Sequence, residues 1–237
     1  MPISTGERLK NVNWEAAEAS LWEFGYAKLG AILTPDECNH LIQLYGQDDP
    51  FRSRIDMARY RFGVGDYKYF ADPLPDMVVE IRRQSYPPLA RIANAWMEAL
   101  GLGARYPANL GGLQEICRAA GQTKPTPLLL HYEAGGYNCL HQDLYGDVAF
   151  PMQMVCFLSE PDQDYSGGDF LLVEQRPRAQ SVGEAVRGRK GEAVVFTTRY
   201  RPVKGSRGYY RGDVKHGVSR VLSGARYTLG VIFHDAK

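Results

Sequence analysis

The segment LLLHYEAGGYNCLHQDLYGDVAFPMQMVCFL, residues 128–158, decides the fold class of this chain. It begins and ends with a short apolar run that lacks the spacing of a helix, and turn-forming residues stand between the two runs. Similar runs continue toward the C-terminus, and the five together are residues 128–132, 152–158, 170–174, 193–196 and 227–233. Many short strands separated by turns are typical of a β-sandwich or jelly roll. The sequence therefore predicts a mainly β fold, with supporting helices, whose core spans residues 125–237.

The preceding residues, 1–124, have a different pattern and predict a mainly helical support region. Thr34, Pro35 and Glu37 together form the start of a helix, with a capping threonine, a first-turn proline and a glutamate that completes a capping box. Apolar residues then recur with helical spacing at Cys38, Leu41, Ile42 and Tyr45. Gly46 ends this helix, so one of its faces is expected to pack inward.

A strand, a hairpin and two further helices are also expected in the support region. The strand covers residues 25–29, the hairpin covers 52–70 with two glycines in its middle, and the helices cover 77–85 and 88–100, separated by Pro87-Pro88. A chain of 237 residues is within the usual size of an undivided β-rich domain. We therefore expect one catalytic domain over residues 1–237.

Composition limits the class of protein. Apolar residues at 44% and charged residues at 23% are ordinary globular values, which exclude a fibrous or wholly disordered chain. No apolar run approaches the roughly 18 to 20 residues that span a bilayer, and the N-terminus lacks an apolar signal core. We expect a cytoplasmic protein with no membrane partner and with four reduced cysteines that form no CxxC pair. The oligomeric state has no signature in the sequence.

The positive charges are concentrated in one segment. The net charge is only +1, but residues 176–226 contain 13 Lys or Arg and 3 Asp or Glu. Within this segment, residues 176–189 and 199–211 are expected to be basic, glycine-containing loops. Such segregation favours a polyanionic partner such as nucleic acid, although a solvated surface has the same composition.

The first chemical motif is His141-Gln142-Asp143. In an extended segment, residues two apart point to the same side, so His141 and Asp143 present an imidazole and a carboxylate to one ion. One more histidine would complete a face of two histidines and one carboxylate, which leaves open coordination positions on Fe(II). The motif alone is weak, because HxD occurs by chance in many proteins.

The second motif, HGVSRVLSGAR at residues 216–226, strengthens the first. It supplies His216 and, ten residues later, Arg226. In a strand, Arg226, Thr228, Gly230 and Ile232 share one face. A planar guanidinium binds a carboxylate through paired charge-assisted hydrogen bonds, so the pattern predicts a pocket for a dicarboxylate beside the metal.

These motifs, together with GGDF at residues 167–170, resemble the prolyl-hydroxylase-like branch of the 2-oxoglutarate/Fe(II) oxygenases. The resemblance implies a double-stranded β-helix and an oxidoreductase that uses Fe(II), 2-oxoglutarate and O2. It implies that His141, Asp143 and His216 are the iron ligands and thus the catalytic residues, and that Arg226 binds the distal carboxylate of 2-oxoglutarate. Tyr132, nine residues before the first ligand, resembles the tyrosine that lines the co-substrate pocket in that branch.

Further pocket residues follow from their positions. Thr228 shares the face of Arg226, and Gln153 in the next strand could hydrogen-bond the co-substrate or be satisfied by the backbone. The expected substrate-binding residues are aromatic, namely Tyr67, Tyr69, Tyr209 and Tyr210, although for the last pair packing at the barrel mouth is the alternative. His131 is expected to be a hydrogen-bonded pocket or core residue and not a metal ligand.

The substrate is suggested by a second, longer resemblance. GDYKYF at residues 65–70, IANAW at 92–96 and the basic insert before His216 resemble a bacterial oxygenase family that acts on alkylated DNA. This implies DNA repair by oxidative dealkylation of alkylated bases, with DNA favoured over RNA as partner. Two alternatives remain open at this point: hydroxylation of a protein or peptide side chain, as by a prolyl hydroxylase, and a non-catalytic metal-binding β-sandwich module. A small-molecule substrate is a weaker third.

Overall fold

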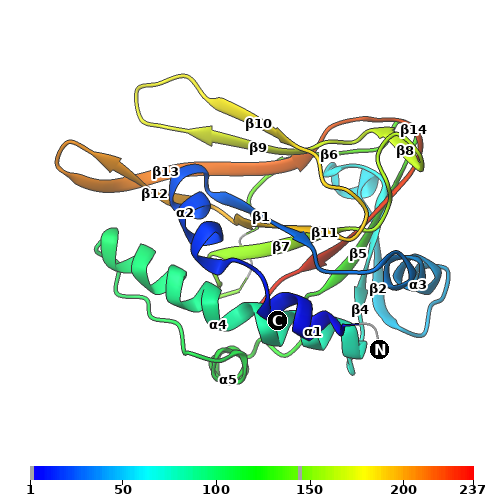
Figure 1. The fold of residues 1–237 in the computed structure, drawn as a ribbon, viewed down its shortest axis with the longest axis horizontal. Helices are drawn as coiled ribbons and strands as arrows, with labels where there is room; N and C mark the ends of the chain where they lie inside the picture. The colour runs from blue at the N-terminus through cyan, green and yellow to red at the C-terminus, as the bar shows by residue number, and fades with distance from the viewer. Residues whose placement is uncertain (1–2, 144–145) are drawn as a thin grey trace.

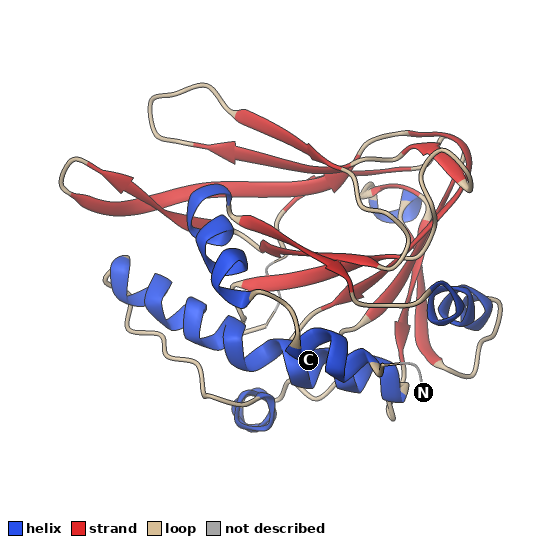
Figure 2. Cartoon of the chain, in the orientation of Figure 1, coloured by secondary structure: helices blue, strands red, loops and turns tan. Residues whose placement is uncertain are grey.

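Two antiparallel β-sheets face each other in the computed structural model, which describes residues 3–143 and 146–237 (Figures 1 and 2). The eight-stranded major sheet runs in the order β1 (Tyr26–Ala31), β11 (Glu192–Thr197), β7 (Met152–Phe157), β14 (Val221–Val231), β5 (Leu128–Glu133), β4 (Asp66–Phe70) and β2 (Phe51–Asp56), and β8 (Tyr165–Gly167) pairs with β14. The six-stranded minor sheet runs in the order β10 (Val182–Val186), β9 (Phe170–Gln175), β13 (Gly208–Val218), β6 (Tyr137–His141) and β3 (Gly63–Val64), and β12 (Tyr200–Gly205) pairs with β13. The predicted mainly β fold is confirmed.

Helices cover the outer face of the major sheet. They are α1 (Thr5–Lys10), α2 (Trp14–Phe24), α3 (Pro35–Tyr45), α4 (Asp76–Ala99) and α5 (Leu110–Ala119), and a short 3-10 turn, η1 (Ala58–Tyr60), lies between β2 and β3. Strand alternation sends Leu229 and Val231 of β14 into the helix-side core with Trp96, while Arg226 and Thr228 face the minor sheet. The predicted common face of Arg226, Thr228, Gly230 and Ile232 is thus confirmed. No helix among the described residues is long and apolar enough to cross a bilayer.

The space between the sheets is filled at one end and open at the other. The filled part is a buried cluster of eight residues: Val155, Phe157, Phe170, Leu172, Val186, Val194, Phe196 and Val214. The remainder is a cavity, described below, that is lined by residues of both sheets. The sheets therefore position the site, and the helices close the outer side of one of them.

In the support region, the prediction from local sequence is right for the start of α3 and wrong for α4. The Thr34 hydroxyl accepts a hydrogen bond from Glu37 N, and Glu37 Oε2 accepts one of 2.7 Å from Thr34 N, so the predicted capping box is confirmed. The prediction of two helices was wrong, because α4 continues through Pro87 and Pro88. Buried side chains flank the prolines on one continuous stripe: Val78, Ile81, Ser85, Leu89, Ile92 and Trp96. Burying this stripe outweighs the two backbone hydrogen bonds that the prolines remove.

The basic segments were also wrongly predicted as loops. Residues 182–186 form β10, which pairs with β9, and residues 200–205 and 208–218 form β12 and β13, which pair with each other. The turn between them uses Gly208 at φ 117°, a conformation that favours glycine. These segments are strands because each pairs with a strand next to it in the chain, and composition does not reveal that pairing. The β2–β4 hairpin, by contrast, is present as predicted.

Candidate active site

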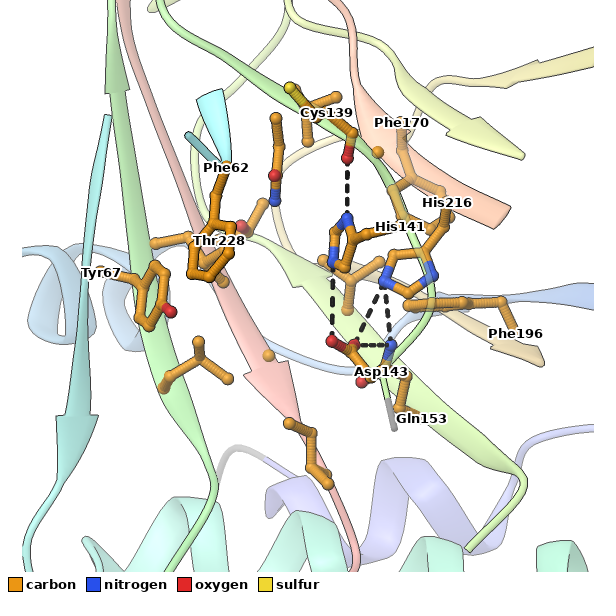
Figure 3. A pocket seen from close by; sticks show the side chains of 18 of the residues that line it. Phe62, Tyr67, Cys139, His141, Asp143, Gln153, Phe170, Phe196, His216 and Thr228 are labelled. Carbon is orange, nitrogen blue, oxygen red and sulfur yellow. Dashed lines mark hydrogen bonds and ion pairs between the residues drawn. The ribbon is translucent and has the colours of Figure 1, made fainter. Parts of the chain in front are cut away.

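The two histidines of the predicted motifs lie opposite each other on neighbouring strands. His141 ends β6 and His216 is its antiparallel partner on β13, and their ring centroids are 4.3 Å apart. Asp143 follows β6 and turns toward both rings: its Oδ1 is 3.5 Å from His141 Nε2, and its Oδ2 is 3.2 Å from His216 Nε2 (Figure 3). One ligand atom from each residue lies within 4.8 Å of the other two. The structure thus gathers the three predicted ligands at one point.

Neighbouring groups hold these side chains in a metal-binding state. The His141 Nδ1–H donates to the Cys139 carbonyl at 2.8 Å, which leaves its Nε2 with a free lone pair. Burial, followed by the nearby His216, lowers the pKa of His141, which favours the neutral imidazole. Burial alone would raise the pKa of Asp143, but hydrogen bonds and charges from His216, His141 and Gln153 outweigh it and hold that pKa well below its usual range. A neutral imidazole and an ionised carboxylate are the forms that bind a cation.

Gln153 of β7 connects the cluster to the major sheet. Its side-chain amide Nε2 donates to Asp143 Oδ2 at 2.6 Å and lies 3.2 Å from His216 Nε2. The amide therefore contacts two of the candidate ligands directly. The sequence left open a hydrogen bond to the co-substrate or to the backbone, and the contact with Asp143 was not anticipated.

A cavity of about 620 Å³ extends from this cluster between the sheets. Arg226 lies deep in its wall and is only 1% exposed. All three of its guanidinium nitrogens are buried, and within the described chain none makes a hydrogen bond of good geometry. The rings of Tyr132, Phe157 and Tyr165 surround the cation at 5.6, 5.7 and 6.0 Å from its Cζ.

An unpaired buried cation is costly, because burial removes its hydration and aromatic rings return only part of that free energy. A carboxylate that enters the cavity would restore two charge-assisted hydrogen bonds. Two histidines, one carboxylate and this arginine are therefore a donor set that fits Fe(II) together with a dicarboxylate such as 2-oxoglutarate. The residues present fit the predicted cofactors.

The remaining predicted residues fall into two groups. Tyr132, Thr228, Tyr67 and Tyr69 line the cavity with Arg226. Among the described residues, Tyr209 and Tyr210 are not part of the cavity lining, because they lie on the outer β12–β13 hairpin. The Tyr209 ring packs there against Trp22, with ring centroids 5.5 Å apart. His131 pairs with Asp66 at 3.3 Å and stacks on Tyr227, as expected for a structural histidine.

Sequence reasoning missed several residues of the cavity. Asn138 donates to the Tyr132 hydroxyl at 3.4 Å, and Arg61 and Phe62 contribute from the segment between η1 and β3. Tyr165, from β8, approaches the Arg226 guanidinium. The sequence offered two signals for these residues: the glycines that follow Tyr165 and the aromatic residues on either side of Arg61. Neither signal predicts a pocket unless the fold is known.

Comparison with solved structures defines the class of fold. A prolyl-4-hydroxylase from Pseudomonas putida superposes with a TM-score of 0.55 at 17% identity, covering 94% of this chain and 100% of that one. An oxidoreductase of the 2OG-Fe(II) oxygenase family from Burkholderia pseudomallei also gives 0.55, at 14% identity, covering 95% and 94%. The fold is therefore that of the double-stranded β-helix oxygenases, as predicted.

Sequence comparison gives the family. Residues 65–236 match the model of the family described as "Oxygenase, catalysing oxidative methylation of damaged DNA", and this chain belongs to that family. Two uncharacterised Mycobacterium tuberculosis proteins, from strains CDC 1551 and H37Rv, are each 50% identical over 167 residues, which is 70% of this chain and 72% of theirs. The predictions that the chain is an oxygenase and that it uses Fe(II), 2-oxoglutarate and O2 agree with this membership, with the fold and with the donor set.

Proposed function

We propose that this oxygenase removes alkyl groups from nucleic acid bases by oxidation, with DNA the favoured partner. The observation that carries the proposal is the match of residues 65–236 to a family whose description names damaged DNA. The cavity supports it, because tyrosines 67 and 69 line it beside the His-Asp-His cluster and can contact a flat heterocycle. Exposed cations on the minor-sheet hairpins, which include Lys204, Arg207 and Arg211, add a surface for phosphates.

In this proposal, His141, Asp143 and His216 hold the iron. When bound, Fe(II) couples the oxidative decarboxylation of 2-oxoglutarate by dioxygen to the hydroxylation of a substrate C–H bond. Hydroxylation of an N-alkyl carbon produces a hemiaminal, which releases an aldehyde and restores the base. The chain itself supplies binding, orientation and the exclusion of water.

Individual residues have distinct tasks in this arrangement. Arg226 binds the distal carboxylate of 2-oxoglutarate, and the Thr228 hydroxyl two residues along the same face can donate to it. Tyr132, which is fully buried beside the guanidinium, forms a wall of that pocket. Gln153 keeps the Asp143 carboxylate directed toward the histidines. Phe170 and Phe196 line the cavity beside His216 and keep water from that side.

Two alternative functions are separated by other observations. The structural likeness to a prolyl-4-hydroxylase favours a peptide side chain as the second candidate substrate. A non-catalytic metal module is disfavoured, because a site that only holds a metal has no use for the unpaired, buried Arg226.

The test is a substrate screen under defined cofactor loading. The protein is first titrated anaerobically with Fe(II) and 2-oxoglutarate, and then exposed to air with N-methylated DNA or RNA oligonucleotides, single and double stranded, or with proline-containing peptides. Release of succinate and formaldehyde in equal amounts with a methylated oligonucleotide supports the proposal. Succinate release with a peptide and no aldehyde would replace it by the prolyl-hydroxylase alternative, and Asp143→Ala is the inactive control.

A further inference from the structure

Four large apolar side chains are exposed together at the mouth of the cavity. Tyr60 is 49% exposed, Phe62 48%, Val64 44% and Leu140 43%, and we call these four residues the rim patch. Phe62 and Leu140 line the cavity, the Tyr60 ring stacks on that of Phe62, and Val64 lies on β3, which pairs with the strand of Leu140. Single exposed apolar residues are common, but a contiguous group beside a cavity marks an interaction surface.

The segment that carries the patch is fixed in place. Met57, which is fully buried, donates from its backbone N to Gly65 O at 3.0 Å and accepts at its carbonyl from Phe62 N at 3.0 Å. Cys139 N donates to Phe62 O at 2.8 Å, which joins the segment to the strand that ends at His141. Between the aromatic residues, Arg61 has the left-handed backbone angle φ 60°, which is rare outside glycine and is held by these bonds. The patch is thus preorganised relative to the candidate metal ligands.

The chemistry of the patch combines flat rings with positive charge. The Tyr60 and Phe62 rings are stacked, with centroids 5.6 Å apart and an interplanar angle of 20°. Arg59 places its guanidinium carbon 5.8 Å from the Tyr60 ring centroid, and Arg61 lines the cavity itself. Stacked aromatic faces flanked by guanidinium groups match the alternation of bases and phosphates in an unpaired nucleic acid strand.

We propose that Tyr60 and Phe62 form a stacking platform for an unpaired base next to the nucleotide in the cavity, with Arg59 and Arg61 contacting the adjoining phosphates. This inference rests on the proposed function, since it assumes that the substrate is a nucleic acid. It adds a requirement for single-stranded or locally unpaired substrate, because a base stacked within a duplex has no free face to offer. The platform selects for strandedness, while the cavity selects the modified base.

The experiment compares two ligands of equal charge. One is a fluorescent oligothymidylate of about twelve nucleotides, a length within the usual site sizes, and the other is a deoxyribose-phosphate strand of the same length that lacks bases. Binding to the anaerobic Fe(II) and 2-oxoglutarate complex is measured by anisotropy for the parent, Tyr60→Ala, Phe62→Ala and the double variant. Phe24→Ala is the matched control, because Phe24 is an aromatic residue of similar exposure, 47%, on α2, an element that contributes no residue to the cavity lining.

We expect the parent to bind the base-bearing strand more tightly than the abasic one. The double variant should lose roughly tenfold or more of its affinity for the base-bearing strand, the range expected for lost base stacking, and almost none for the abasic strand. Phe24→Ala should bind both as the parent does. Equal losses for both strands, no loss for either, or a parent that does not discriminate between them would overturn the inference.

Two further measurements separate this inference from the proposed function. Folding of the double variant is checked beforehand by its circular dichroism spectrum and its thermal unfolding, compared with those of Phe24→Ala. Base-dependent binding without release of formaldehyde from methylated oligonucleotides would leave the platform standing and remove the dealkylation. Unchanged kcat/KM for a methylated single strand in the double variant would remove the platform and leave the dealkylation.

Discussion

The two sheets contribute different chemistry to one cavity. The minor sheet carries His141 and His216, whose rings and the adjacent Asp143 are already in contact. The major sheet carries Arg226, whose guanidinium has no good hydrogen bond within the described residues. The contacts among the candidate ligands are therefore made before any ligand binds, although His216 Nδ1 lacks a hydrogen bond within the described residues, whereas on the other side the whole guanidinium lacks one. Arg226 therefore says more about the ligand than the histidines do, because burying its charge costs stability that a bound carboxylate would restore.

The surroundings of the two sheets also differ. Helices cover the major sheet, and its outward residues form the main core. The minor sheet extends into two hairpins, β9–β10 and β12–β13, that project beyond the helical layer (Figure 1). Gln142, between the two candidate ligands of the HxD motif, donates to Arg199 O and Val214 O at the base of the second hairpin. The minor sheet thus links the metal cluster to the exposed cationic surface.

The largest effect is expected from removing the minor-sheet carboxylate. Asp143→Ala should abolish bound Fe(II) and 2-oxoglutarate-dependent succinate release, because two imidazoles alone hold a divalent cation weakly. Metal content after gel filtration and succinate release are the measurements. Asp147→Ala, which changes a carboxylate that is 71% exposed, is the control and should behave as the parent. Full turnover in Asp143→Ala would contradict the iron assignment.

The second effect concerns the major sheet and should leave the metal in place. Arg226→Met should weaken 2-oxoglutarate binding on the order of 100-fold, because two charge-assisted hydrogen bonds are lost. The same variant without co-substrate should be more stable than the parent, since an unpaired buried charge is replaced by an apolar side chain. Anaerobic calorimetric titration and thermal unfolding test both. Unchanged 2-oxoglutarate affinity would show that the distal carboxylate lies elsewhere.

A smaller effect is expected where the sheets meet, at Gln153. Gln153→Leu should weaken Fe(II) binding about tenfold, the lower end of the range for residues that orient a metal ligand. The KM for 2-oxoglutarate, measured at saturating metal, should change less than the metal affinity. If KM rises and metal affinity does not, Gln153 contacts the co-substrate and the orienting role is wrong.

The charged hairpin should affect the salt dependence of oligonucleotide binding. Replacing Lys204, Arg207 and Arg211 by alanine should reduce the slope of log affinity against log salt by about 2, which corresponds to about three lost single-strand phosphate contacts. The control replaces three exposed cations of the helical layer, Lys10, Arg105 and Arg118, with the same change in charge. Equal slopes for both triple variants would indicate that net charge, and not the hairpin, governs binding.

The smallest effect concerns acid stability at the edge of the major sheet. Burial alone would raise the pKa of Asp66, but hydrogen bonds from His131, Tyr45 and Arg54 outweigh it and lower the pKa to about 2. Because the pKa in the unfolded chain is roughly 4, the ionised carboxylate stabilises the fold above that pH, and this contribution is lost as the pH falls toward 2. The free energy of unfolding should therefore fall less steeply with acid in Asp66→Asn than in the parent. Asp49→Asn, at an exposed site in the loop between α3 and β2, should keep the parent's slope.

Much of the site could be predicted because its determinants are local. Residues two apart in an extended segment share a face, which gave His141 with Asp143 and Arg226 with Thr228. The capping box at Thr34 is equally local and was also predicted. Arg226 stands ten residues after His216 in the second motif. This arginine supported reading both motifs as one site, since a metal site alone has no need of it.

The errors arose where packing or strand pairing decided the outcome. α4 stays continuous through Pro87 and Pro88 because the residues on both sides bury one stripe against the sheet. The segments taken for basic loops became β10, β12 and β13 because each found a partner strand. The composition of a segment shows neither its packing nor its pairing.

The sequence by itself determined the donor groups of this protein: two imidazoles, one carboxylate and a guanidinium at fixed spacings within two sequence motifs. Only the tertiary structure decided that His141 faces His216 across a strand pair and that Gln153 contacts Asp143. It also buried Arg226 among aromatic rings, with no hydrogen bond of good geometry within the described residues. It also decided that Tyr60 and Phe62 are exposed beside the cavity while Tyr209 packs against Trp22. The physical reason is that chain geometry fixes the direction of a side chain over a few residues, whereas burial and pairing depend on elements far away in the sequence.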